Sequence, residues 1–240
     1  MSDPCLPPLY RLAAVDAGSN AFAQAVGLAA GTSQDGTVVW SRRSDRLDCA
    51  IVFRPEAPLP EALPVVYPVA LGLGDAIGAL APPVTAVHFR WPDRIEVNGA
   101  FAGGLRAGWA GGMATEDTTG WLVVGVCVLV ASPQAPSAER TTLQDEGCMD
   151  MTTTGLLESF SRHALAWINR WQDDGFDPVR EAWLSRAAGL SGDVALELSD
   201  GRIAGRFAGL DERGNLLLTV DRLTRTVALA DALRRPSWQL

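Results

Sequence analysis

Residues 89–106 read FRWPDRIEVNGAFAGGLR, and this stretch decides the fold. A Trp-Pro pair ends one apolar run, and an Asn-Gly pair at 98–99 then separates two strand-like segments, 94–97 and 101–110. Asn-Gly between two such segments is a strong short-range hairpin signal. The stretch therefore predicts an antiparallel hairpin, and its second strand carries the pair Gly103-Gly104.

Segments of strand and helix character flank this hairpin on both sides. Apolar runs rich in Val and Ile, or bounded by Gly and Pro, predict strands at 9–16, 37–43, 48–55, 86–91 and 120–131. Apolar residues at helical spacing predict helices at 21–30, 65–81, 152–173 and 176–187. Residues 55–64 and 132–142 are rich in Pro or polar residues and are expected to be loops.

The character of the sequence changes near residue 190. From about Gly192 onward, short alternating segments are separated by turn signals such as Asp200-Gly201. This pattern predicts a small antiparallel barrel or sheet of about five strands. The prediction is an α+β protein in which residues 1–190 form a mixed sheet flanked by helices and residues 191–240 form a small β domain.

Composition limits the classes of ligand. The formal net charge is −8 and the pI is about 4.8, which argues against general nucleic-acid binding because that requires a basic surface. The sequence contains no lysine, so all 20 basic side chains are arginines. Any phosphate or carboxylate must therefore be held by guanidinium groups, which bind such anions with a fixed fork of donors.

Cysteine and histidine spacing gives no sign of a metal site. The four cysteines are far apart and form no C-x-x-C motif, and the two histidines are also widely separated. No run of about eighteen apolar residues lacks both charge and Pro, so no membrane span is expected. The first residues have no basic region ahead of an apolar one, so we expect no secretory signal and a cytoplasmic location.

The hairpin stretch and its surroundings resemble the biotin/lipoate protein ligase family. The segment RWPDRIEVNGAFAGG is similar to the family's Lys-Trp-Pro-Asn-Asp segment, which is followed by a short strand, a turn and a Gly-Gly pair. WLVVGVCVLVA resembles its Gly-x-Gly-x-Asn strand, and TTLQDEG resembles its Thr-Ser-Leu-x-x-Glu-Gly stretch. The tail, with GLDERGNLLL, resembles the SH3-like C-terminal domain of the family.

This resemblance implies a fold related to class II tRNA synthetases and a reaction in two steps. An acid (biotin, lipoate or a fatty acid) is activated by ATP with Mg²⁺ to an acyl-adenylate. The acyl group is then transferred to a lysine on a carrier protein. No winged-helix segment precedes the predicted catalytic domain, so the DNA-binding repressor role of some family members is not expected.

The resemblance also assigns residues to the site. Arg90 stands where the family has its catalytic lysine, so it would steady the carboxylate and the α-phosphate. The residues expected to bind the ligand are Ser19, Asn20, Arg42, Arg43, Trp91, Pro92, Asp93, Gly103 and Gly104. Read from the residues alone, several also suit structural roles: Ser19 and Asn20 as a helix cap, Trp91 in the core, and the two glycines in a hairpin.

Three departures from the family pattern concern chemistry. SRRSDRLDCA replaces the family's Gly-Arg-Gly-Arg-x-Gly-Arg loop, so the glycines are absent, although Arg42, Arg43 and Arg46 keep positive charge there. Arg90 replaces the lysine, with a bulkier and planar cation. Leu129 stands where the family strand has Asn, and Cys127 stands where it has Gly.

Three functions therefore remain open at this point. The first is an ATP-dependent ligase, and the second is a binding module for a small acid or a carrier domain. The third is ATP-independent acyl transfer, in which a cysteine carries the acyl group. The absence of lysine and the acidic surroundings of Cys148 disfavour the third, because nearby acids raise the pKa of a thiol. The sequence does not choose between biotin, lipoate and a fatty acid.

Overall fold

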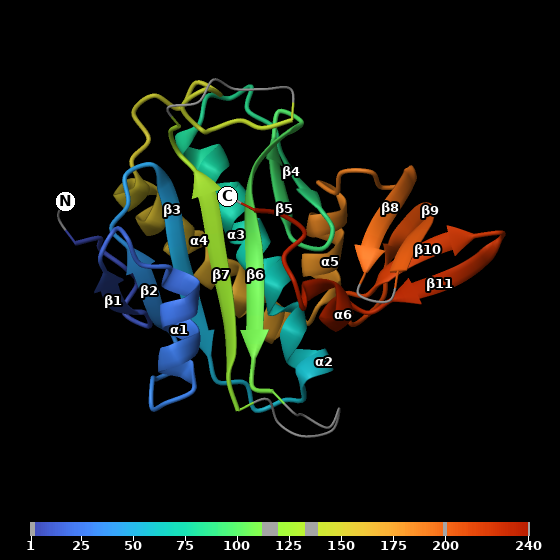
Figure 1. Ribbon diagram of the computed structural model, residues 1–240, viewed down its shortest axis with the longest axis horizontal. Coiled ribbons are helices and arrows are strands. Elements are labelled where there is room, and N and C mark those ends of the chain that lie inside the picture. Colours follow the sequence, from blue (N-terminus) through green and yellow to red (C-terminus); the bar gives the residue numbers. More distant parts are fainter. Residues whose placement is uncertain (1–2, 112–119, 133–138, 199–200, 240) are drawn as a thin grey trace.

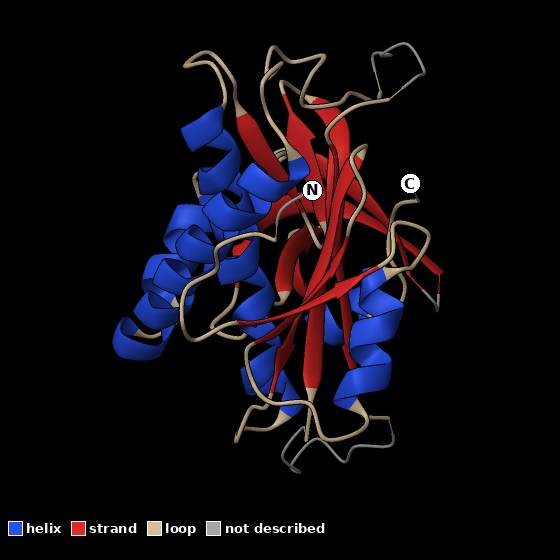
Figure 2. Ribbon diagram, turned by 90° about the vertical axis from the view of Figure 1, so that its left-hand side faces the viewer, coloured by secondary structure: helices blue, strands red, loops and turns tan. Residues whose placement is uncertain are grey.

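The computed structural model describes residues 3–111, 120–132, 139–198 and 201–239. These residues form one large and one small sheet with helices on both faces of the large one (Figures 1 and 2). The large sheet has seven strands in the order β1-β2-β3-β7-β6-β5-β4. The β1–β2 pair is parallel and every other pair in it is antiparallel, so the sheet is mixed.

The bounds of the elements follow the chain. The strands of the large sheet are β1 (Arg11–Val15), β2 (Thr37–Ser41), β3 (Arg46–Phe53), β4 (Val87–Arg90), β5 (Arg94–Val97), β6 (Ala100–Trp109) and β7 (Leu122–Leu129). The helices are α1 (Ala21–Ala29), α2 (Leu59–Ala62), α3 (Val66–Leu80), α4 (Thr153–Asp174), α5 (Asp177–Leu184) and α6 (Leu229–Leu233), with a 3-10 turn at Leu63–Val65. The small sheet contains β8 (Asp193–Leu198), β9 (Gly201–Leu210), β10 (Leu216–Val220) and β11 (Leu223–Val227).

One face of the large sheet is covered by α3 and α4, which form its main core (Figure 2). The two helices approach closely at Gly72, where a Cβ atom would overlap the backbone of Ala164. The helix α4 is amphipathic, and it begins at Thr152, whose side chain accepts a hydrogen bond from the Gly155 N–H. The helical stretch Leu59–Leu80 is long and apolar enough to cross a membrane by length and composition, but 78% of its most apolar window is buried inside the protein.

The opposite face is covered by α1 alone and has a smaller apolar cluster. Alternation along β3 divides its side chains between the faces, so Leu47 and Ile51 meet α3 and α4, whereas Ala50 and Val52 meet α1. Because α1 has only nine residues, it covers only part of this face. The uncovered part lies at the N-terminal end of α1, beside β3, β7 and β6 (Figure 1).

The last residues return from the small sheet to the large one. After α6, residues 235–239 run back and place Ser237 and Trp238 beside β5 and β6 (Figure 1). The hydroxyl and N–H of Ser237 donate hydrogen bonds to Asp93, and the Trp238 indole N–H donates to the Leu105 carbonyl at 3.2 Å. The C-terminal residues therefore contribute to the uncovered part of the large sheet.

The predicted fold class is confirmed: a mixed sheet is flanked by helices and followed by a small antiparallel sheet. Two details differ from the sequence-based expectation. Residues 59–64 are helical rather than loop, because prolines in the first turn of a helix lack only an N–H that would be unpaired there. The described part of the tail has four strands, and α6 takes the place of a fifth because Leu229 and Leu233 are buried at helical spacing.

Candidate functional site

A cavity of about 240 Å³ lies on the α1 face of the large sheet, at the start of α1. It is bounded by the turn before α1, by the end of the β2–β3 connection, by β6 and β7, and by the C-terminal segment. The lining residues are Gly18, Ser19, Asn20, Phe22, Arg43, Arg46, Asp48, Arg106, Gly125, Val126, Cys127 and Trp238. Four of these twelve side chains are charged, which is unusual for the interior face of a sheet.

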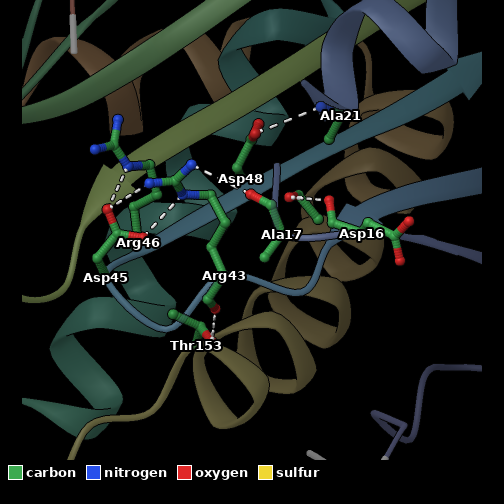
Figure 3. Close-up of polar contacts among 9 residues, drawn as sticks. Asp16, Ala17, Ala21, Arg43, Asp45, Arg46, Asp48 and Thr153 are labelled. Atoms are coloured by element: carbon green, nitrogen blue, oxygen red, sulfur yellow. Dashed lines mark hydrogen bonds and ion pairs between the residues drawn. The ribbon is translucent and has the colours of Figure 1, made fainter. Parts of the chain in front are cut away.

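The start of α1 forms one wall of this cavity. Asn20 is the N-cap, and its side-chain oxygen accepts a hydrogen bond from the Ala23 N–H at 2.8 Å. The Ala21 N–H points toward the sheet and donates to the Asp48 carboxylate at 3.4 Å (Figure 3). The Phe22 ring packs directly on Gly125 of β7, where a Cβ atom would come within 2.7 Å of the ring. Gly125 therefore lets α1 lie close to the sheet.

A cluster of two arginines and one acid forms the second wall (Figure 3). Arg43 donates two hydrogen bonds to the Asp45 carboxylate, both at 2.8 Å, and Arg46 donates a third at 2.9 Å. The Arg43 hydrogen bond is the main reason that the pKa of Asp45 is lowered to about 2, although partial burial opposes this. The two guanidinium groups are thereby held in fixed positions, and one of their two positive charges is neutralised.

Backbone contacts attach this cluster to two other elements. Arg43 donates to the Ala17 carbonyl at 3.2 Å, and its own carbonyl accepts from the Thr153 hydroxyl at 2.7 Å, at the first turn of α4. The Ser41 hydroxyl donates to the Asp16 carbonyl at 3.2 Å. The connection between β2 and β3 is thus fixed to both α1 and α4, although it lacks glycines.

The floor of the cavity is polar. Asp48 of β3 and Cys127 of β7 are cross-strand partners, so their side chains lie next to each other on the same face. Burial raises the pKa of Asp48, although the Ala21 N–H and nearby arginines oppose this effect. Burial, together with Asp48, raises the pKa of the Cys127 thiol to about 11. Cys127 is therefore a protonated thiol at neutral pH and a poor nucleophile.

Arg106 of β6 supplies the remaining charge. In the described part of the chain it has no ion-pair partner, and its buried Nε has no hydrogen-bond partner. Its guanidinium lies over the Trp238 ring, 4.7 Å from the ring centroid, in a cation–π contact. Arg106 is thus a cation beside the cavity, and Asp48 and Asp93 feel its charge without forming an ion pair with it in the described part of the chain.

This arrangement suits a ligand with an anionic end and a hydrogen-bonding end. An unpaired guanidinium binds a carboxylate or phosphate through two parallel N–H donors. Asp48, Ser19 and Asn20 offer oxygen atoms that accept hydrogen bonds from a ligand N–H or O–H. Among the described residues, no group of three or more His, Cys, Asp or Glu side chains is placed to hold a metal ion.

Three of the residues assigned from the sequence line this cavity: Ser19, Asn20 and Arg43. Arg42 does not. Its side chain is about half exposed and pairs with Asp3 at 2.7 Å. Both arginines follow the end of β2, and the difference lies in their partners: Asp45 holds Arg43 at the cavity, whereas Asp3 holds Arg42 away from it.

The residues of the Trp-Pro hairpin lie in a different place. Arg90, Trp91 and Pro92 line a second cavity of about 600 Å³ between the hairpin, β8 and the C-terminal segment. Arg90 pairs with Glu96 at 2.5 Å, and the buried Trp91 donates to the Tyr67 hydroxyl at 2.9 Å. The structure therefore does not bring Arg90 to the cavity that contains Ser19 and Arg43.

The other three assigned residues meet protein atoms. Gly103 lies against the backbone of β7, and Gly104 lies against the Trp238 indole and the Asp93 carbonyl. Asp93 is 1% exposed and accepts both hydrogen bonds of Ser237. Burial raises the pKa of its carboxyl to about 6, although these hydrogen bonds oppose the shift. In this structure, protein side chains rather than an acyl chain fill the space beside the two glycines.

Nine of the twelve lining residues were not assigned to the ligand site from the sequence, and three of these nine bear most on its chemistry. Asp48 stands inside the apolar strand LDCAIVF, and a single acid in such a strand is a signal of an inward-pointing polar group. Arg106 follows the glycine pair by two residues, so it shares the face of Gly104. Trp238 carries no such local signal, because its role depends on the return of the C-terminal segment.

The cysteines do not form a nucleophilic centre. Burial and the nearby Glu146 raise the pKa of Cys148, as the acidic sequence around it suggested. The buried Cys49 has a raised pKa for the same main reason. The pKa values of Cys49, Cys127 and Cys148 are all raised, so acyl transfer through any of these three thiols has no support from the site.

Comparison with protein families gives a decisive match. Residues 6–185 match the family model described as the biotin/lipoate A/B protein ligase family. This match covers three quarters of the 240 residues, including β1 to α5 and the whole cavity apart from Trp238. The chain belongs to this family.

Two curated members of the ligase family show the range of its relatives. A biotin–[acetyl-CoA-carboxylase] ligase of Paracoccus denitrificans is 25% identical over 185 residues, which are 75% of this chain and 76% of the relative. The bifunctional ligase/repressor BirA of Bacillus spizizenii is 23% identical over 83% of this chain, which spans 59% of the relative's length.

Solved structures support the same conclusion. A biotin protein ligase-like protein of unknown function from Silicibacter sp. is 32% identical with a TM-score of 0.87, covering 97% of this chain and all of that one. The biotin protein ligase of Aquifex aeolicus in complex with biotin and ATP has a TM-score of 0.71 over 91% of this chain and 95% of that one. At 18% identity, the Aquifex likeness concerns the fold alone.

Proposed function

We propose that this protein binds a small carboxylic acid of the biotin or lipoate type and activates it with ATP. The product would be an acyl-adenylate, and the acyl group would then pass to a lysine on a carrier protein. One observation carries the proposal: Arg106 has no ion-pair partner among the described residues, and it lies beside a cavity whose floor carries Asp48. A cation and a hydrogen-bond acceptor in one small cavity match the two ends of such an acid.

The two ends of the acid are expected to bind to opposite walls. The carboxylate would pair with Arg106, which lies at the β6 side of the cavity, next to the second cavity. The far end of the acid would lie between Phe22 and Asp48, where an apolar ring and an acceptor are both present. This orientation would point the carboxylate toward the second cavity, where a nucleotide has room.

The second cavity suits ATP as the other substrate. Its volume is about 600 Å³, and its lining includes Arg90, Arg94 and Arg235. The buried Nε of Arg94 has no hydrogen-bond partner among the described residues, so this side chain has a donor to offer. The carboxylate would attack the α-phosphorus of ATP and take its adenylyl group, pyrophosphate would leave, and the product would be a reactive mixed anhydride. Since the sequence contains no lysine, arginines would hold the phosphates.

Mg²⁺ would accompany the nucleotide. The described residues contain no cluster of three acidic, His or Cys side chains that could hold an ion. Mg²⁺ commonly keeps several waters and binds mainly through substrate phosphates. The structure therefore fits a metal delivered with ATP better than a metal that stays on the protein.

The name of the Paracoccus relative suggests the kind of acceptor. That protein is a ligase for acetyl-CoA carboxylase, so a biotin-carrying domain of such a carboxylase is the acceptor we propose to test first. A lipoate-carrying domain is the alternative, since the family includes both kinds of ligase.

A second candidate function is binding without activation. Asp45 occupies donors of both Arg43 and Arg46, and Trp238 stands between the two cavities. A site arranged in this way would bind the acid but would separate it from the nucleotide. The protein would then act as a binding module for a small acid or for a carrier domain.

ATP–pyrophosphate exchange separates the two functions. The assay would contain Mg²⁺ and, in turn, biotin, lipoate and fatty acids of six to ten carbons. Exchange that depends on one acid would establish activation and identify that acid. The variant Arg106→Gln should lower the exchange rate about 10- to 100-fold, because a charge-assisted hydrogen bond contributes about 1.5–3 kcal/mol.

The matched control is Arg170→Gln. Arg170 also stacks on a tryptophan, at 5.3 Å, but it lies on α4 away from both cavities. This variant should keep the rate of the unmodified protein. Acid binding without exchange, measured by calorimetry on folded protein, would favour the binding module. Absence of both binding and exchange would overturn the proposed function.

A further inference from the structure

The C-terminal segment, residues 235–239, lies outside the region matched by the family model. Through Trp238 it forms one wall of the cavity of about 240 Å³ in which we propose that the acid binds, called here the acid cavity. Its anchor is Ser237, whose N–H donates to the Asp93 carboxylate at 2.8 Å and whose hydroxyl donates to the other oxygen. Because Asp93 is almost fully buried, these hydrogen bonds hold the segment against the start of β5.

Trp238 is fixed by four contacts. It is 3% exposed, and its indole N–H donates to the Leu105 carbonyl at 3.2 Å. One ring face carries the Arg106 guanidinium, and the ring lies 6.1 Å from the Phe101 ring. Its edge lies on Gly104, where even a single Cβ atom would overlap the indole. The glycine therefore creates the space that the indole fills.

Trp238 is also the residue that the two cavities have in common. It lines the smaller cavity together with Arg106 of β6, and it lines the larger cavity together with Pro236 and Ser237. The indole thus separates a space of about 240 Å³ from one of about 600 Å³. A tryptophan ring is large and rigid, so a wall made by it limits the length of a ligand more strictly than a flexible side chain would.

We propose that Trp238 is the specificity-determining residue of the acid site, and that it restricts the site to compact acids and excludes long acyl chains. This inference rests on the proposed function, since it presumes that the cavity binds a carboxylic acid. The indole would act in two ways. An acid too long for the space between Arg106 and Phe22 could fit only if its carboxylate end moved past Gly104 into the larger cavity, and the indole would block that movement. The indole would also hold Arg106 beside the carboxylate of a compact acid. Arg106 is the contacting cation, and Trp238 positions it.

The test compares acid binding by three forms of the full-length protein: unmodified, Trp238→Ala and Trp238→Phe. Isothermal titration calorimetry would measure the affinity for biotin, lipoate, octanoate and dodecanoate. With Trp238→Ala, the affinity for dodecanoate relative to the most compact acid that binds should rise at least about tenfold, which corresponds to about 1.4 kcal/mol. With Trp238→Phe, which keeps an aromatic wall, the ratio should change less.

Trp167→Ala is the matched control. Trp167 also donates a hydrogen bond, to Asp75 at 2.7 Å, and it also lies against an arginine, Arg170. It belongs to α4 on the opposite side of the large sheet, so its loss should leave the affinity ratio unchanged. If Trp238→Ala does not fold, Ser237→Ala serves in its place, because it loosens the anchor of the segment while keeping the ring.

The outcomes separate this inference from the proposed function. The inference is supported if the affinity for dodecanoate, relative to the most compact acid that binds, rises only in variants of the C-terminal segment. The inference is overturned if the folded Trp238→Ala protein still binds compact acids and its affinity ratio stays within twofold of that of the unmodified protein. The proposed function would then still stand. If no acid binds to the unmodified protein or to Trp238→Ala, both the proposed function and the inference are overturned.

Discussion

On one face of the large sheet, β3 presents Leu47, Cys49 and Ile51 to α3 and α4. On the other face, the same strand presents Asp48 and Ala50 to α1. The first face is covered by two helices of 15 and 22 residues, and the second by a single helix of nine. The face covered by the two longer helices must present apolar side chains along its whole length. The nine-residue helix leaves part of the other face uncovered, so charged side chains can lie there without being buried under a helix. From this contrast we expect the first face to contribute most of the stability and the second face to bind the proposed ligand.

The largest expected effect is on the free energy of unfolding, when substitutions on the two faces of the same strand, β3, are compared. Ile51→Ala removes a buried side chain from the α3–α4 face and should lower the free energy of unfolding by about 2–5 kcal/mol, because the cavity cannot fully collapse. Asp48→Asn, three residues away on the other face, should change it by less than about 1 kcal/mol, because the carboxylate pays a desolvation penalty that the amide avoids. Urea unfolding followed by tryptophan fluorescence measures both.

Acid affinity should show the opposite order. Asp48→Asn removes a charged acceptor from the cavity floor and should weaken acid binding, whereas Ile51→Ala should leave the affinity of the remaining folded protein nearly unchanged. The contrast between the faces fails if Asp48→Asn destabilises the protein as much as Ile51→Ala does.

Two glycines allow a second, smaller test of the same contrast. Gly72→Ala places a methyl group against the backbone of Ala164, between α3 and α4, where neither helix can move without disturbing the other. It should cost about 1–3 kcal/mol, reduced somewhat by the better helix propensity of alanine. Gly125→Ala places a methyl group 2.7 Å from the Phe22 ring, which has the cavity beside it to move into.

The Gly125→Ala variant should therefore lose less than about 1 kcal/mol of stability but should bind the acid more weakly, because Phe22 would occupy part of the cavity. Thermal unfolding and calorimetric titration measure the two effects. Equal losses of stability in the two glycine variants would show that the α1 face is as tightly packed as the opposite face.

Local sequence patterns were enough to predict most of the fold. Asn98 and Gly99 have φ angles of 50° and 86°, which the tight turn between β5 and β6 requires, and the hairpin forms where Asn-Gly indicated it. The amphipathic spacing of α4 also gave its extent correctly. The helical turn at 59–64 was missed because Pro60 and Pro64 suggested a loop, although both stand in first-turn positions.

The site was only partly predictable, because its residues come together through tertiary contacts. Ser19, Asn20 and Arg43 follow strand ends, a position that the sequence pattern makes visible. Arg106 and Trp238 are 132 positions apart along the chain, and no local pattern connects them. Arg90 has the right charge and a familiar neighbour in Trp91, but the pairing of β4 with β5 turns it toward Glu96.

The smallest expected effect concerns Asp45, whose carboxylate holds Arg43 and Arg46 in the cavity wall. Asp45 has its pKa lowered to about 2, so its ionised form is favoured in the folded protein. This contribution to stability is complete above the ordinary value of 3.8 and is lost as the pH falls toward 2. The Asp45 side chain is one-third exposed, and solvent screening therefore limits the contribution to about 1 kcal/mol.

The variant Asp45→Asn should accordingly be less stable than the unmodified protein by about 1 kcal/mol at pH 5, and this difference should shrink as the pH falls from 4 to 2. Urea unfolding at several pH values measures it. A pH-independent difference would mean that the carboxylate charge contributes nothing and that Asp45 acts only through its shape. In that case Arg43 and Arg46 would be positioned by their backbone surroundings, including the contacts with Ala17 and Thr153, and the α1 face would depend less on charge than the comparison of the two faces implies.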